Sequence, residues 1–148
     1  MTVQMAIERA NEMKQGNVVP DNLKMLWLTE LDHIIYDEVI KTHLHKIPLR
    51  EGDYSEWWYW DDEEKKWKFR DAPEYTERNT DEEMIAEPPE DMLYVYWLMA
   101  KIDLYSQELN KYNNDMAIFE NSYQRFKNKY HRNHHTVPLP HIKVGVFR

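Results

Sequence analysis

The sequence contains no cysteine, which excludes disulfide bonds, thiolate metal sites and cysteine nucleophiles. It has only three glycines, whereas the phosphate-binding loops of nucleotide enzymes need several at fixed spacing. Long hydrophobic runs are also missing, because the longest uncharged apolar stretch, 92–100, is far shorter than the roughly 20 residues of a membrane span. We therefore expect a soluble protein made in a reducing cytoplasm, with no signal peptide and no membrane partner.

Basic residues are outnumbered, with 19 Lys and Arg against 27 Asp and Glu and a net charge of -8. The average field repels nucleic acid, so specific binding of duplex DNA is not expected. Aromatic residues are abundant, with six Trp and ten Tyr among 148 residues. Because Trp and Tyr are enriched at protein interfaces, we expect some of these rings to contact partners.

Four segments carry the apolar spacing of helices, at about residues 2–14, 21–43, 90–109 and 110–132. The third is apolar on nearly every side, which is typical of a central helix. The fourth carries a seam spaced alternately by four and three residues, which we expect to pack along the third helix. The seam consists of Tyr112, Met116, Phe119, Tyr123, Phe126 and Tyr130.

Prolines and acidic residues break the helical pattern over residues 47–88, which predicts a β-rich insertion. Aromatic runs at 57–60 and 67–69 flank a polar stretch, 61–66, and this pattern indicates an exposed β-hairpin. A short extended piece at 84–86 is expected to pair nearby. We predict a mainly α fold in one domain, 1–148: a bundle of about four helices with an inserted β-hairpin and an extended C-terminal arm, 133–148.

The sequence gives only weak evidence for catalytic or metal-binding residues. A histidine run near the end of the fourth helix, His131, His134 and His135 with His141 beyond, could place two imidazoles on one ion. The run contains no carboxylate, however, and the helix dipole explains histidines at this position equally well. The acidic pairs lie in a proline-rich loop, and no serine has the context of a nucleophile elbow. We expect no catalytic residue, no metal and no cofactor, and hence no enzyme.

Four local strings resemble a known family: Trp27–Tyr36 (WLTELDHIIY), Glu87–Tyr94 (EPPEDMLY), Tyr112–Phe119 (YNNDMAIF) and Tyr130–His134 (YHRNH). They are similar to small proteins of tailed phages, and of prophages in low-GC Gram-positive bacteria, of the head-to-tail connector (adaptor) type. The resemblance covers the four helices and the order of the elements. It implies a structural virion protein at the head-tail junction, which forms a dodecameric ring under the portal protein. Such a ring prolongs the DNA channel and docks neck or tail proteins, while DNA passes without specific binding.

Two sets of residues are candidates for these roles. The partner-binding candidates are the hairpin aromatics and the apolar residues of the arm: Trp57, Trp58, Trp60, Trp67, Phe69, Ile142, Val144, Val146 and Phe147. A basic channel wall would hold the phosphates of passing DNA, so acidic clusters are the candidates for facing the channel. These are Asp61, Asp62, Glu63, Glu64, Asp81, Glu82 and Glu83, and solubilising the loop is the other explanation for them.

The string 142–147 has the length and composition of a strand, and prolines at 138 and 140 separate it from the last helix. We expect it to add a strand to a sheet edge on the portal, on an adjacent subunit or on the middle region of its own chain. Two other functions stay open. One is a different neck or tail-completion protein, and the other is a ligand-binding module whose Trp-rich hairpin stacks on sugars or unpaired bases.

Overall fold

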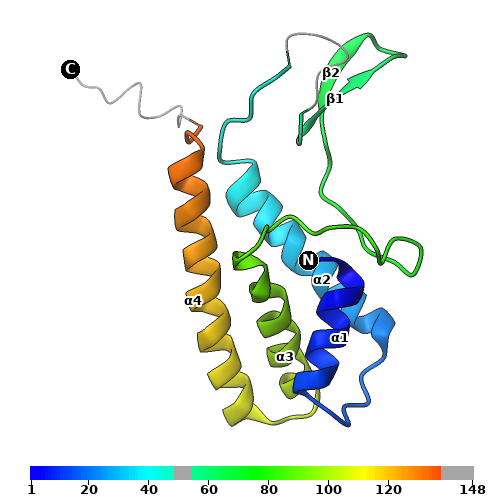
Figure 1. Cartoon of the computed structure of the whole chain (residues 1–148), viewed down its shortest axis with the longest axis vertical. Coiled ribbons are helices and arrows are strands. Elements are labelled where there is room, and N and C mark those ends of the chain that lie inside the picture. Colours follow the sequence, from blue (N-terminus) through cyan, green and yellow to red (C-terminus); the bar gives the residue numbers. More distant parts are fainter. Residues whose placement is uncertain (49–54, 138–148) are drawn as a thin grey trace, which may run out of the picture.

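The computed structural model of the chain describes residues 1–48 and 55–137 (Figure 1). The helices are α1 (Val3–Met13), α2 (Asp21–Ile35), α3 (Leu93–Tyr105) and α4 (Leu109–Asn133). A π-helical turn, η1 (Tyr36–Ile40), continues α2, and a 3-10 turn, η2 (Glu90–Met92), leads into α3. The strands β1 (Trp58–Asp61) and β2 (Lys66–Phe69) form an antiparallel hairpin. The predicted mainly α bundle with an inserted hairpin is confirmed.

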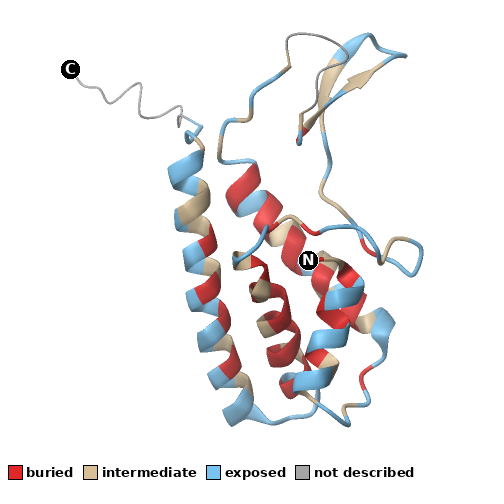
Figure 2. Ribbon diagram, in the orientation of Figure 1, coloured by how far each residue is buried: buried red, intermediate tan, exposed pale blue. Residues whose placement is uncertain are grey.

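Helix α3 lies at the centre, with α4 on one side and α1 and α2 on the other (Figure 1). Figure 2 shows that the buried residues follow α3 and the inward faces of its neighbours. The largest side chains of α3 that are fully buried are Leu93, Tyr94, Val95 and Leu98. The predicted central position is thus confirmed for most of the helix. It is wrong at the last turn, where Leu104 and Tyr105 are 42% and 50% exposed.

Helix α2 differs from its prediction in length and in its buried face. Regular helix ends before residue 43, because η1 closes at Ile40 and the chain then becomes irregular. Leu26 is 57% exposed, while Leu28, Leu31 and Ile35 are buried. The helix is therefore turned so that Asp32 also faces the core.

The aromatic seam of α4 packs as predicted along α3. Phe119 is buried, and its ring lies 5.0 Å from that of Trp97 on α3. The rings of Phe119 and Tyr123 stack 5.7 Å apart, and those of Phe126 and Tyr130 lie 5.8 Å apart. This continuous contact explains why α4 is straight and long although many of its residues are polar.

The hairpin stands away from the bundle (Figure 1). Its register pairs Trp58 with Phe69 and Trp60 with Trp67. The predicted pairing of 84–86 close to the hairpin is wrong. Instead, the Met84 amide donates a 3.1 Å hydrogen bond to the Met1 carbonyl, so this segment lies along the start of α1.

None of the helices in the described part of the chain has the length and hydrophobicity that crossing a bilayer requires. The arm residues proposed as partner contacts, Ile142, Val144, Val146 and Phe147, lie outside the described residues.

Candidate interaction surfaces

The base of the hairpin is attached to the bundle by aromatic packing. Trp57 is only 7% exposed, and its ring lies 5.7 Å from Tyr36 of η1 and 5.9 Å from Phe69 of β2. The Tyr36 hydroxyl donates a 2.5 Å hydrogen bond to the carbonyl of Arg70. Trp57, predicted to contact a partner, is thus an anchoring residue inside the chain itself.

The other predicted hairpin aromatics share one face of the two-stranded sheet. Side chains alternate between the faces of a strand, and the register places Trp58, Trp60, Trp67 and Phe69 on the same side. The rings of Trp60 and Trp67 meet edge to face, 5.5 Å apart. All four side chains are half-buried. Phe69 also packs on Trp57 and Tyr36, and the Trp58 indole donates a 3.0 Å hydrogen bond to the His45 carbonyl, so this face is partly occupied within the chain.

The acidic residues at the hairpin tip have structural partners. Asp61 Oδ1 accepts hydrogen bonds from the amides of Glu63 and Glu64, at 2.9 and 3.1 Å, and so stabilises the turn. Asp61 Oδ2 lies 2.7 Å from Lys68 Nζ, and Glu64 also pairs with Lys68. The hydrogen bond from Lys68 is the main reason that the pKa of Asp61 lies below its ordinary value. At the tip itself, Asp62 and Glu63 are exposed and have no ion pair with a described residue.

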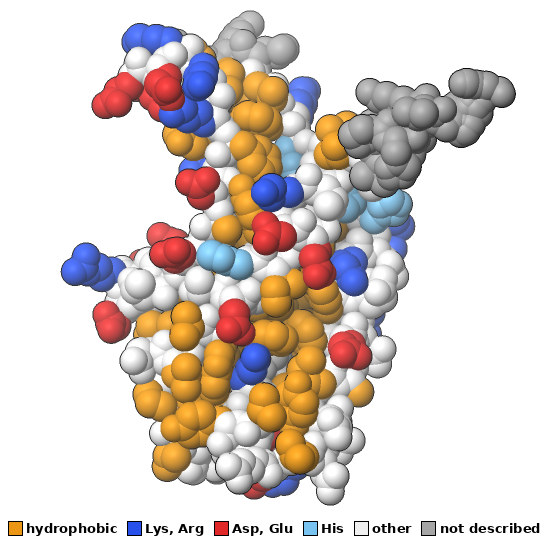
Figure 3. Space-filling model, turned by 180° about the vertical axis from the view of Figure 1, so that it is seen from behind, with side chains coloured by type: hydrophobic (Ala, Val, Ile, Leu, Met, Phe, Trp, Pro, Cys, Tyr) orange, Lys and Arg blue, Asp and Glu red, His pale blue; other side chains and the backbone are white. Residues whose placement is uncertain are grey.

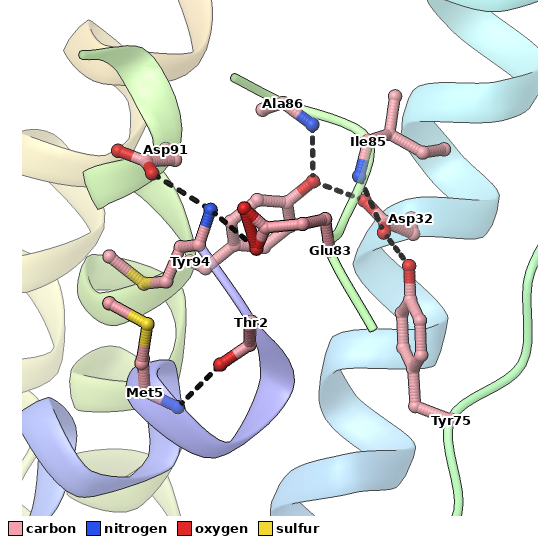
Figure 4. Close-up of polar contacts among 10 residues, drawn as sticks. Thr2, Met5, Asp32, Tyr75, Glu83, Ile85, Ala86, Asp91 and Tyr94 are labelled. Carbon is pink, nitrogen blue, oxygen red and sulfur yellow. Dashed lines mark hydrogen bonds and ion pairs between the residues drawn. The ribbon is translucent and has the colours of Figure 1, made fainter. Parts of the chain in front are cut away.

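The second acidic cluster, 81–83, lies at the start of α1 rather than near the hairpin tip (Figure 1). Glu83 Oε2 is 3.4 Å from the Met1 amino group, which also lies 3.0 Å from Asp91 Oδ2 (Figure 4). Asp81, Glu82 and Glu83 are all exposed. The two predicted channel-facing clusters are therefore not brought together within one chain.

An apolar face covers the ends of α2 and α3 (Figure 3). We define the α2–α3 apolar face by Leu26, Trp27, Leu104 and Tyr105. Trp27 and Tyr105 contact each other edge to face with a centroid distance of 6.4 Å. The nearby ion pair of Lys101 with Glu30, at 3.5 Å, leaves this surface without net charge of its own. Sequence reasoning missed the face because it treated the whole of the third helix as central.

A buried carboxylate, Asp32, joins three parts of the chain (Figure 4). It accepts hydrogen bonds from the hydroxyls of Tyr75 and Tyr94, the latter at 2.5 Å, and from the Ile85 amide at 3.2 Å. Burial raises the pKa of Asp32 to about 6, although these hydrogen bonds favour the charged form. An aspartate among Leu28, Leu31 and Ile35 was the available sequence signal for this network.

A second polar cluster lies where α1, α3 and α4 meet. Lys14 Nζ is 2.9 Å from Asp103 Oδ2 and 3.0 Å from Asp115 Oδ2. Burial opposes the charge on Lys14, but hydrogen bonds to both carboxylates raise its pKa. Burial, followed by the neighbouring Asp115, raises the pKa of Asp103 to about 6. Every member of this cluster has a partner within the chain, which is the pattern of a structural ion network.

An open cleft of about 770 Å³ separates the hairpin from the segment 82–88. Its walls include Tyr59 and Arg70 of the hairpin, whose side chains contact each other at 5.5 Å. Several carboxylates, among them Glu56 and Glu87, also line it. An aromatic and charged wall of this kind suits the ligand-binding alternative.

The predicted histidine run does not form a metal site within the described residues, where no group of three or more suitable side chains is arranged to hold an ion. Instead, His131 and His134 gather with His43 and His45 around Tyr130. His141 lies outside the described residues.

Comparison of the chain with protein-family models, with curated proteins and with solved structures found no match.

Proposed function

We propose that this protein is a structural virion subunit, a head-to-tail connector that assembles into a ring under the portal of a tailed phage. In this role it prolongs the DNA channel and docks neck or tail proteins. The observation that carries the proposal is the α2–α3 apolar face. Leu26, Leu104 and Tyr105 are 42–57% exposed on a chain that otherwise has an excess of acidic charge. Tyr105 also contacts Trp27 of α2, and exposed apolar side chains of this size are typical of a protein–protein contact.

The four strings that resemble connector proteins coincide with the elements that build the bundle. Trp27–Tyr36 lies on α2 and η1, Glu87–Tyr94 leads into α3, and the other two strings lie on α4. They contribute buried residues such as Leu31, Tyr94 and Phe119. The resemblance therefore concerns the scaffold, and the docking surfaces are proposed from the exposed residues.

The acidic surface suits passage of DNA. A channel wall without basic patches cannot bind phosphates by releasing counterions, so DNA can slide. The hairpin tip and residues 81–83 belong to different parts of the subunit, and we propose that one of them faces the channel. We propose that the other cluster faces solvent or a docking protein.

The arm is proposed to grip a neighbouring protein by strand addition. The described start of the arm, 135–137, pairs with 42–44 beside the base of the hairpin. A chain truncated after Val137 is expected to keep its helices and to lose attachment to portal-bearing heads. Normal attachment of the truncated chain would contradict this part of the proposal.

Electron microscopy of the purified full chain, alone and mixed with portal-bearing heads, tests the function directly. The expected result is a ring that sits on the portal and that antibodies against this protein label at the head-tail junction. A protein that stays monomeric with portal-bearing heads and is missing from purified virions would overturn the proposal. Labelling at the far end of the neck or on the tail would favour a tail-completion protein instead.

The ligand-binding alternative rests on the cleft beside the hairpin and has a separate test. Trp fluorescence of the full chain is titrated with oligosaccharides and with single-stranded oligonucleotides. Saturable quenching at micromolar ligand, abolished by Tyr59→Ala, would favour a binding module. The Tyr105→Ala variant is a matched control, since Tyr105 is also exposed but lies on the bundle.

A further inference from the structure

Four histidines meet at the point where the chain leaves the bundle. His43 and His45 follow η1, while His131 and His134 lie at the end of α4. The ring of His43 lies 5.6 Å from His131 and 6.4 Å from His134, and the ring of His45 lies 5.4 Å from His134. We call these four residues the histidine cluster. Neutral imidazoles can pack this closely, but charged ones repel one another.

Tyr130 is at the centre of the histidine cluster. Its ring stacks on His134 at 3.9 Å and meets His43 edge to face at 5.2 Å. Its hydroxyl lies 2.5 Å from His45 Nε2. A neutral His45 can accept a hydrogen bond from this hydroxyl, whereas a protonated His45 could only donate to it, and the hydroxyl proton would have to turn elsewhere.

The histidine cluster also lies on a strand-like pairing between two distant segments. The Leu44 amide donates a 2.7 Å hydrogen bond to the His135 carbonyl, and the Val137 amide donates a 2.8 Å hydrogen bond to the Thr42 carbonyl. His43 and Thr136 face each other in this antiparallel bridge. Two backbone hydrogen bonds near the surface provide modest stability, so the packing of the imidazoles decides whether the pairing holds.

The neutral form also suits the hydrogen bonds of His43. Its Nδ1 lies 2.7 Å from the Val39 carbonyl, so this nitrogen carries the proton when the ring is neutral. Its Nε2 is buried and has no hydrogen-bond partner among the described residues. Protonation would place a second N–H there, and burying an N–H without an acceptor costs free energy.

The charged groups around the histidine cluster come from every neighbouring segment. The segment before β1 contributes Glu56, and the segment before η2 contributes Glu87, both lining a pocket together with Tyr130 and His134. Glu90 lines the same pocket but pairs with Lys129 of α4 at 2.8 Å. The remaining neighbours are the exposed Lys46, Arg132 and His135, and Phe69 on β2 is uncharged.

These neighbouring charges do not remove the electrostatic repulsion that protonated imidazoles in the cluster would experience. Glu56 and Glu87 line the same pocket as His134. The pKa of Glu56 is raised by burial and then by Glu87, which shows that the two carboxylates also repel each other. Burial, followed by His134 and His43, lowers the pKa of His45 to about 4. The rings of His43 and His45 lie 6.4 and 5.4 Å from that of His134, so a charge on one of these imidazoles faces the others.

We propose that residues 135–137 stay paired with 42–44 only while the histidine cluster is neutral, so that mild acid breaks this pairing and leaves the four helices folded. This goes beyond the connector function and does not depend on it. It makes the contact between the end of α4 and the hairpin base sensitive to pH in the range where histidine changes its charge.

Nuclear magnetic resonance of the full chain tests the proposal, in steps from about pH 7.5 to about pH 4.5. Through-space contacts between His43 and Thr136 report the pairing, the imidazole nitrogens report protonation, and circular dichroism reports the helices. The expected result is loss of the His43–Thr136 contacts over the same pH range in which cluster histidines take up protons, with unchanged helix signal. Contacts that persist down to about pH 4.5 would overturn the proposal.

Variants separate the histidine cluster from other acid-sensitive groups. The double variant His45→Gln with His134→Gln is expected to keep the pairing in acid, because glutamine cannot be protonated. His135→Gln is the matched control, since His135 is exposed in the same segment, and it should behave like the wild type. Equal loss of the pairing in the double variant and the wild type would contradict the proposal. If the double variant is unpaired already at neutral pH, the titration of the wild type decides the question. Loss of the wild-type pairing in a pH range where no histidine of the cluster takes up a proton would then contradict the proposal.

Discussion

The Tyr94 hydroxyl donates a 2.5 Å hydrogen bond to Asp32 Oδ1 and accepts a 2.8 Å hydrogen bond from the Ala86 amide. Tyr94 and Asp32 are both fully buried. One hydroxyl group therefore connects α3 with α2 and with the irregular segment that precedes η2. A long loop that carries the hairpin is thus attached to the core at its C-terminal end.

Replacing Tyr94 with Phe is expected to lower the free energy of unfolding by about 1–3 kcal/mol, because the Ala86 amide and Asp32 each lose a buried partner. Urea unfolding followed by circular dichroism measures the change. Tyr105→Phe is the matched control on the same helix, since Tyr105 is half exposed, and it should change stability by less than about 0.5 kcal/mol. Equal effects of the two variants would show that the buried hydroxyl does not matter.

The ionisation of Asp32 is expected to make stability depend on pH. Burial raises its pKa from 3.8 to about 6, so between these values the folded state holds more protons than the unfolded state. The contribution of the protonated carboxyl is present below about pH 4 and is lost as the pH rises through 6, by about 3 kcal/mol in total.

Comparison with Asp32→Asn isolates this contribution. The stability of the wild type relative to the variant should decrease as the pH rises from about 4 to about 7, as measured by urea unfolding at each pH. A difference between the two proteins that does not change with pH would mean that the carboxyl does not titrate in this range.

The fold was largely predictable, because apolar periodicity determines which face of a helix is buried. The seam of α4 and the aromatic strands of the hairpin are regular enough to give both element type and packing. The exact face of α2 was not predictable from periodicity, because the buried Asp32 obtains its hydrogen bonds from Tyr75 and Ile85, about forty to fifty residues away in sequence. Long-range polar contacts of this kind leave almost no local pattern.

The candidate surfaces were less predictable than the fold. Trp57 has the composition of an interface residue, but its neighbours Tyr36 and Phe69 cover it. Conversely, Leu104 and Tyr105 look like core residues and are exposed, because they face away from the bundle, whereas Ile102 and Asp103 beside them are buried. The histidine cluster joins residues about ninety positions apart, which no spacing rule relates.

The packing of α4 on α3 predicts the cost of truncating Phe119. Phe119→Ala should lower the free energy of unfolding by about 3–5 kcal/mol, because the ring is buried against Trp97 and a cavity would remain. Ile118→Ala is the control, since Ile118 is 46% exposed on the same helix and should contribute little. Chemical unfolding of both variants measures the difference. A loss below about 1 kcal/mol for Phe119→Ala would contradict the observed packing.

The turn of the hairpin is expected to depend on Asp61 and not on the adjacent Asp62. Asp61→Ala removes the acceptor for two backbone amides and should destabilise the hairpin locally by about 1 kcal/mol. Amide hydrogen exchange across β1 and β2 measures this effect. Asp62→Ala removes the same charge from an exposed position and should leave exchange unchanged. Faster exchange in both variants would point to charge, and not to the turn, as the stabilising factor.

The last prediction concerns self-association of the chain through the α2–α3 apolar face. A glutamate at Leu26 or Leu104 would have to lose its hydration to enter a protein interface, and an unpaired buried charge is costly. Because both residues are exposed in the single chain, Leu26→Glu and Leu104→Glu should leave its circular dichroism unchanged. Each should weaken self-association by about tenfold or more, as measured by sedimentation over a range of concentrations. Val18→Glu is the matched control, because Val18 is 83% exposed and lies in the connection between α1 and α2. Unchanged association of the Leu26 and Leu104 variants, or an equal loss in the Val18 variant, would show that subunits do not meet through this face.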